Sequence, residues 1–175
     1  MVLIIDAQIA GISGDMILSS LVSLGANKSR IIEGVHTAES LLDDSKITNI
    51  DFVSVQKNGK VATQLILEID ENVHERKGTD VKNCIIEASK KIGLSKPGLD
   101  FVTNSINTLI SVESKVHGEP ESSVHFHETA SIDTVIDILG TAIALDDLNL
   151  FNDQIICSPV AVSYTHLTLP TNREV

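Results

Sequence analysis

Aromatic residues are scarce in this sequence, and tryptophan is absent. Phe, Tyr and Trp together make up 3% of the 175 residues. Proteins that bind single-stranded nucleic acid stack the bases on aromatic side chains, so this composition offers little material for such recognition. Cationic residues are also few, because 13 Lys and Arg stand against 24 Asp and Glu and the formal net charge is −11. This balance argues against nucleic acid and anionic membranes as partners, whereas an acidic surface concentrates cations.

Cysteine and long apolar runs are lacking as well. Cys84 lies in a helical pattern and Cys157 in a strand pattern, without any CxxC motif. This excludes a zinc finger and predicts two reduced, buried thiols in a cytoplasmic protein. No apolar run reaches the length that spans a bilayer, and the first residues lack the charged leader and cleavage site of a signal peptide. We therefore expect a cytoplasmic globular protein with no membrane partner, and its length suits one domain with its own core.

Histidines and carboxylates gather in one stretch in the last third of the chain. His125 and His127 alternate with apolar residues, so an extended segment would direct both imidazoles to one face. Glu128 follows them, and Asp133 and Asp137 lie four residues apart on one face of a predicted apolar helix. Neutral imidazole together with carboxylate oxygen suits a divalent ion of the nickel, zinc, iron or manganese group. The alternatives are structural histidines and a solvated helix face, and the sequence leaves them open.

The first predicted strand leads into a glycine loop and then into a helix. The polar and small residues of this segment are Asp6, Gly11, Ser13, Gly14 and Asp15. A strand, a glycine loop and a helix in this order direct backbone N–H groups and a helix N-terminus at an anion. The loop is neither a dinucleotide-binding fingerprint nor a Walker A loop. The alternative is a tight turn in which the glycines take positive φ and Asp15 is favoured by the helix start.

We expect a single α/β domain with a mixed β-sheet covered by helices. Hydrophobic periodicity predicts strands at residues 2–6, 47–56, 61–69 and 154–162, and helices at residues 14–25, 28–43, 80–92, 98–117 and 131–148. An Asn-Gly turn joins the second and third strands, Thr79 and Ser131 are expected helix caps, and Gly118 a helix stop. Residues 163–175 are Thr-rich and contain the one Tyr. They predict a non-native appended tail behind a domain at residues 1–162.

Several motifs resemble the amino-terminal part of the LarC family of nickel insertion proteins, which make the nickel-pincer nucleotide cofactor of lactate racemase and related enzymes. The motifs are GISGDM at 11–16, VHG at 116–118, VHFHE at 124–128, SID at 131–133 and DILG at 137–140. The resemblance implies a CTP-dependent nickel insertase of the lyase (cyclometallase) class. Its substrate would be a pyridinium bis-thiocarboxylate mononucleotide, on which carbon–nickel and sulfur–nickel bonds form. The family continues beyond residue 162, so the resemblance also implies a fragment, with CTP bound by the part that follows.

The resemblance also implies roles for the candidate residues around Ni²⁺ and the nucleotide substrate. The expected sets are catalytic Asp15, Glu128 and Asp133; cofactor-binding Gly11, Ser13 and Gly14; and metal-binding His125, His127 and Asp6. Other interpretations are a nickel storage or delivery module without catalysis, and a non-functional fragment of an α/β domain. A metal-dependent hydrolase of the barrel type ranks last, because it needs more strands than this chain holds. A homo-oligomer is compatible with the sequence.

Overall fold

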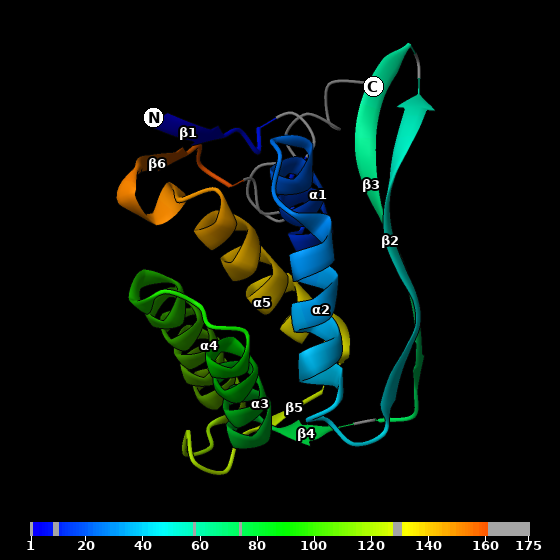
Figure 1. Cartoon of the computed structure of the whole chain (residues 1–175). Coiled ribbons are helices and arrows are strands. Elements are labelled where there is room, and N and C mark those ends of the chain that lie inside the picture. The colour runs from blue at the N-terminus through cyan, green and yellow to red at the C-terminus, as the bar shows by residue number, and fades with distance from the viewer. Residues whose placement is uncertain (1, 9–10, 58, 74, 128–130, 161–175) are drawn as a thin grey trace, which may run out of the picture.

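The computed structural model describes residues 2–8, 11–57, 59–73, 75–127 and 131–160 (Figure 1). Its α-helices are α1 (Gly14–Ser23), α2 (Lys28–Glu39), α3 (Gly78–Lys91), α4 (Lys96–His117) and α5 (Ile132–Asp147). The strands are β1 (Val2–Ile5), β2 (Ser45–Lys57), β3 (Lys60–Glu71), β4 (Arg76–Lys77), β5 (His125–Phe126) and β6 (Gln154–Cys157), and a 3-10 helix, η2, spans Leu150–Asn152. The expected α/β class is confirmed.

Helix α5 forms the centre of the fold. It is apolar on most sides, with buried residues along its whole length, and such a helix must be enclosed by others. Helices α1 and α2 pack on one side of it, and α3 and α4 pack on the other (Figure 1). Gly140 allows α1 to come close, because a Cβ at this position would lie 2.9 Å from Cδ2 of Leu18. The small residues of α5 therefore set the distance at which its neighbours pack.

The strands form three separate pairs within the described residues. β1 and β6 are parallel, whereas β2 with β3 and β4 with β5 are antiparallel. The expected single mixed sheet is therefore not continuous in this part of the chain. The β2–β3 hairpin packs on α1 through β3 and on α2 through β2. The β1–β6 and β4–β5 pairs lie at opposite ends of the molecule (Figure 1).

Some element boundaries differ from the sequence-based expectations. The last strand ends at Cys157 rather than at residue 162, because Pro159 has no N–H to continue the ladder. Helix α3 begins at Gly78 with Lys77 in the N-cap position, so Thr79 is inside the helix and does not cap it. The two-residue strands β4 and β5 pair with each other although they are far apart in the sequence. No local sequence pattern therefore predicts β4.

Glycine ends elements where a positive φ is required. Gly118 has a φ of 69° and closes α4, and Gly59 has a φ of 76° in the predicted β2–β3 turn, as both patterns indicated. The cysteines differ from each other: Cys84 is buried as expected, but Cys157 is exposed because all of β6 is exposed. The prediction of two buried thiols is therefore wrong for Cys157.

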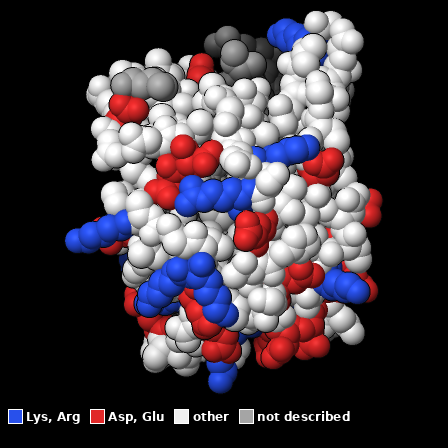
Figure 2. Space-filling model, viewed as in Figure 1, with Lys and Arg blue, Asp and Glu red and all other residues white. Residues whose placement is uncertain are grey.

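The surface carries its charges unevenly on the face that Figure 2 shows. Acidic and basic side chains gather over the middle and lower parts, whereas the upper part, near β1 and β6, is mostly uncharged. Within the described residues, none of the helices combines the length and the apolar character that crossing a membrane requires.

Candidate functional site

The glycine loop places the start of α1 directly against α5. A Cβ at Gly14 would lie 2.0 Å from Cγ of Asp137, so only glycine fits here without displacing that carboxyl. Ser13 has the extended backbone of an N-cap residue, but its hydroxyl donates to the Asp15 carboxylate instead of capping the helix. Gly11 has a φ of 75°, and its amide donates to the carbonyl of Ala7 at 3.1 Å. The Gly11 amide is therefore already used within the loop.

Three carboxylates meet where α1 and α5 begin, and we call Asp15, Asp133 and Asp137 the carboxylate cluster. Burial and, to a smaller extent, the charges of Asp133 and Asp15 together raise the pKa of Asp137 to about 6. No described Lys or Arg side chain forms an ion pair with Asp137. An excess of negative charge at two helix N-termini attracts a cation or a proton. Asp137 can therefore exchange a proton near neutral pH.

Glu71, the last residue of β3, holds the N-terminus of α5. Its carboxylate accepts a hydrogen bond from the Ser131 hydroxyl at 2.5 Å and another from the Ile132 amide at 3.1 Å. Ser131 occupies the predicted N-cap position, but the capping acceptor is Glu71 and not the serine itself. The Arg76 guanidinium pairs with Glu71 at 2.7 Å, and both side chains are almost fully buried. The hydroxyl of Ser45 donates to the same carboxylate.

The ionisation of Glu71 depends on these donors. Burial opposes its negative charge, but hydrogen bonds from Arg76, Ser131, Ser45 and the Ile132 amide outweigh burial and keep the pKa of Glu71 below its usual value. Arg76 is also paired across β4 and β5 with Phe126. One carboxylate therefore connects the strand that carries the histidines to the helix that carries Asp133 and Asp137.

The histidines lie on and beside β5, at the end of the molecule opposite β1. Val124 and Phe126 are buried, which confirms the expected alternation of apolar side chains. His125 is half-buried and lines a polar cavity of about 520 Å³ together with Asp80 and other charged residues. His127 is exposed, and its ring lies edge-on to that of His117 with 5.5 Å between the ring centroids.

The structure brings together only part of the predicted site. Asp15 and Asp133 both belong to the carboxylate cluster. Asp6 follows β1, which lies at the end of the molecule opposite β5 (Figure 1). The carboxylate of Asp6 accepts a hydrogen bond from the Gln8 amide at 3.0 Å. Within the described ranges, no three His, Cys, Asp or Glu side chains are arranged to hold a metal ion. Glu128 lies outside the described residues. The metal-binding and catalytic assignments therefore stay predictions.

Asp137 and Glu71 are more central to the candidate site than their sequence patterns indicate. Asp137 was recognised only by its spacing from Asp133, and that i, i+4 spacing was the available signal. Glu71 has no local signal, because its partners Ser131 and Ile132 follow it by about sixty residues and meet it through the tertiary fold.

Taken together, the molecule is an α/β domain in which the start of α1, with Gly14 and Asp15, faces the start of α5, with Asp133 and Asp137, and Glu71 connects the start of α5 to the β4–β5 pair. The family model described as "Nickel insertion protein" matches residues 3–170. The chain belongs to the nickel insertion protein family. The match extends beyond the predicted domain boundary at residue 162, and the predicted tail lies outside the described residues, so that boundary stays a prediction.

Curated relatives agree with this assignment. The pyridinium-3,5-bisthiocarboxylic acid mononucleotide nickel insertion protein of Staphylococcus saprophyticus is 35% identical over 151 residues, which are 86% of this chain and 36% of that protein. The protein of the same name from Staphylococcus epidermidis is 31% identical over 161 residues, which are 91% of this chain and 38% of that protein. The chain thus spans well under half the length of these relatives. No solved structure gives a significant match to it.

Proposed function

We propose that this chain is the amino-terminal part of a nickel insertase. In this proposal Ni²⁺ is a substrate, and it is inserted into a pyridinium bis-thiocarboxylate mononucleotide during the biosynthesis of the nickel-pincer cofactor. The names of the staphylococcal relatives support the reaction. The observation that carries the proposal for this chain is the meeting of two separate motifs, GISGDM and SIDTVID, at the contact between Gly14 and Asp137.

The carboxylate cluster is the part of the chain best suited to receive the metal. The three carboxylates produce a strongly negative site that attracts a divalent ion, because no described Lys or Arg forms an ion pair with Asp137. Oxygen ligands alone bind nickel less selectively than imidazole does. His125 and His127 are therefore proposed as delivery groups, with Asp133 receiving the ion and Glu128 and Asp6 as the remaining predicted partners.

The chemistry also requires a base. When a carbon–nickel bond replaces a carbon–hydrogen bond on the pyridinium ring, the ring releases a proton. A carboxylate with a pKa near the working pH is an efficient acceptor for it. Asp137, whose pKa is raised to about 6, meets this condition, and Asp15 and Asp133 maintain the raised value. The substrate's phosphate would then lie near the start of α1, at Ser13 and Gly14, where a helix N-terminus favours an anion.

CTP dependence is proposed for the whole enzyme and not for a site on this chain. The 13 Lys and Arg are scattered among 24 acidic residues, and the glycine loop lacks the lysine with which a P-loop binds a triphosphate. Arg76, whose side chain is 9% exposed, is committed to Glu71. A nucleoside triphosphate therefore fits better on the part of the longer relatives that this chain does not match.

Nickel binding tests the proposal. Isothermal titration of Ni²⁺ should give a weaker affinity for Asp133→Asn/Asp137→Asn and for His125→Ala/His127→Ala than for the unchanged chain. Asp70→Asn is the matched control, because Asp70 is exposed on β3 and belongs to neither site. Equal affinities for all four proteins would contradict the proposal.

The alternative is a nickel storage or delivery module without catalysis. An intact relative separates the two functions. In the S. saprophyticus protein, asparagine at the position equivalent to Asp137 should abolish cofactor formation with Ni²⁺, CTP and the thiocarboxylated substrate. If this position serves only nickel storage, the same substitution should leave cofactor formation unchanged and reduce only the amount of bound nickel.

A further inference from the structure

One edge of β1 is open within the described part of the chain. β1 pairs only with β6 there, and the Ser158 amide donates to the Ile5 carbonyl at 2.9 Å. The backbone groups of successive strand residues point to opposite edges. Those of Leu3 and Ile5 therefore face β6, whereas the N–H and C=O of Ile4 point to the open edge. This edge can accept another strand.

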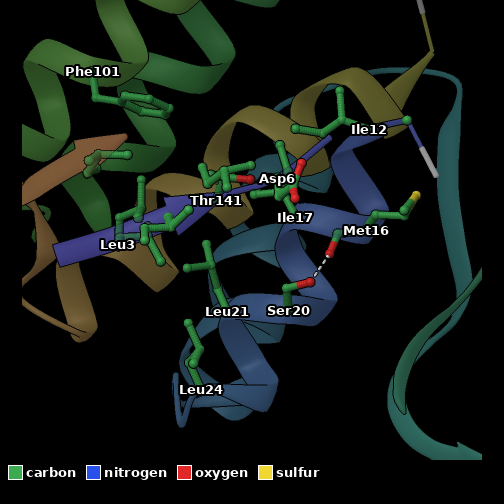
Figure 3. Close-up of a pocket in the computed structure, with 15 residues that line it drawn as sticks. Leu3, Asp6, Ile12, Met16, Ile17, Ser20, Leu21, Leu24, Phe101 and Thr141 are labelled. Atoms are coloured by element: carbon green, nitrogen blue, oxygen red, sulfur yellow. Dashed lines mark hydrogen bonds between the residues drawn. The ribbon is translucent and has the colours of Figure 1, made fainter. Parts of the chain in front are cut away.

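An apolar groove of about 370 Å³ runs beside this strand (Figure 3). Leu3 of β1, Ile17 and Leu21 of α1 and Thr141 of α5 surround it. Asp6 is its one charged lining residue, so the groove is suited to aliphatic side chains and not to a polar ligand. Ser20 lines the groove as well, but its hydroxyl already donates to the Met16 carbonyl at 2.7 Å.

Helix α1 adds to this groove a face that is exposed in the part of the chain that the structure describes. Met16, Ser20 and Leu24 follow one another at intervals of four residues and so share one side of the helix. Met16 is 43% and Leu24 60% exposed, whereas Leu18 and Leu21 on the neighbouring side are buried. Exposed apolar residues that are contiguous mark an interaction surface more often than scattered ones do. The open edge of β1 and this side of α1 together form what we call the β1 edge surface.

The pair β1–β6 is incomplete by the ordinary rules for parallel sheets. Such sheets are covered on both faces and contain more than two strands. Here Val2 is 50% and Ile4 69% exposed, and all four residues of β6 are exposed. The staphylococcal relatives carry more than half of their length outside the region that this chain matches. That further polypeptide is available in the family to complete the sheet.

We propose that a strand from this further part of the family's polypeptide pairs with the open edge of β1 and directs alternate aliphatic side chains into the groove. A second copy of the chain is a poor occupant, because Leu3 and Ile5 of its own β1 already face its own groove. Two chains of net charge −11 also repel each other. Main-chain hydrogen bonds give the affinity in this mode of binding, and the groove selects uncharged side chains.

The test mixes this chain with the separately produced unmatched part of the S. saprophyticus relative, without nickel, so its result does not depend on the proposed function. Amide hydrogen exchange should show a complex in which the Ile4 amide is protected. Ile4→Pro removes this N–H and no hydrogen bond to β6, because proline is tolerated at a strand edge. It should weaken binding roughly tenfold and leave the melting temperature of the chain unchanged. Leu24→Glu should have a similar effect, because it places a charge on the groove.

The control is Val61→Glu, which adds the same charge at a 72% exposed position at the start of β3. It should leave the affinity unchanged. A complex insensitive to both Ile4→Pro and Leu24→Glu overturns the proposal, and so does self-association of the chain that protects the same amide. If the two parts do not assemble, the intact relative decides: slow exchange at the position equivalent to Ile4 supports the proposal, and fast exchange overturns it.

Discussion

Replacement of Asp137 by asparagine should stabilise the fold at neutral pH. The carboxyl of Asp137 lies between the start of α1 and two other carboxylates, and its pKa is raised from 3.8 to about 6. Between these two values the folded state holds more protons than the unfolded state, so stability falls as pH rises through this window. Asparagine has nearly the same shape but no charge, and it removes the cost of ionising the buried group.

The size of the effect follows from the pKa difference. A difference of about two units corresponds to at most about 3 kcal/mol, and solvent screening of a half-buried group reduces it. We therefore expect Asp137→Asn to raise the free energy of unfolding by roughly 1–2 kcal/mol at pH 7.5. The melting temperature should rise by about 2–4 °C for each kcal/mol in a chain of this length.

Urea unfolding followed by circular dichroism from pH 3.5 to 8 measures this dependence. The gain in Asp137→Asn should be largest above pH 6 and should disappear as pH falls below 3.8, where the unfolded carboxyl becomes protonated as well as the folded one. Asp70→Asn, at an exposed position, should give a flat difference across the same range. A loss of stability in Asp137→Asn at pH 7.5 would refute the reasoning, because it would mean that the ionised carboxylate has a stabilising partner.

Three further predictions concern other contacts. Glu71→Ala should cost about 3–5 kcal/mol in urea unfolding, because it removes the carboxylate that pairs with Arg76 and accepts from Ser131 and from the Ile132 amide; the stabilisation from Glu71 is present above its unfolded pKa of 4.5 and is lost as pH falls through the lower pKa of the folded state. Gly14→Ala should cost about 1–3 kcal/mol by overpacking, and a double-mutant cycle should show a smaller cost in an Asp137→Ala background; equal costs would contradict the contact. Thiol labelling of the native chain should modify Cys157 and not Cys84, whose pKa is raised to about 12 by burial; rapid labelling of both would contradict the packing.

Local signals were enough to predict most helices but not the pairing of strands. α4 begins after Ser95, whose side chain accepts from the Gly98 amide, and ends at Gly118, and both signals are visible in the sequence. The β2–β3 hairpin follows from its Asn-Gly turn in the same way. The three-pair arrangement of strands could not be predicted, because β1 meets β6 and β4 meets β5 only through contacts between distant parts of the chain.

For the candidate site too, contacts within one element could be predicted from the sequence, whereas contacts between distant residues could not. The i, i+4 spacing of Asp133 and Asp137 predicts two carboxylates on one helix face. The structure agrees, because the charge of Asp133 contributes to the raised pKa of Asp137. The contact of Gly14 with Asp137 joins residues that are far apart in sequence, so no local pattern contains it. The grouping of Asp6 with His125 stays a prediction, and the described residues do not bring the two together, since β1 and β5 lie at opposite ends of the molecule (Figure 1).

The bonds of Glu71 make the histidine strand and the carboxylate helix thermodynamically dependent on each other. Glu71 holds Arg76, which is paired with β5, and at the same time holds Ser131 at the start of α5. A ligand that binds one of these regions and changes the geometry of Glu71 therefore changes affinity at the other. Such coupling is reciprocal, because the two sites must change each other's binding free energy by the same amount. Protonation of Glu71 would release both regions together, so acid should uncouple the imidazoles from the carboxylates before it unfolds the core.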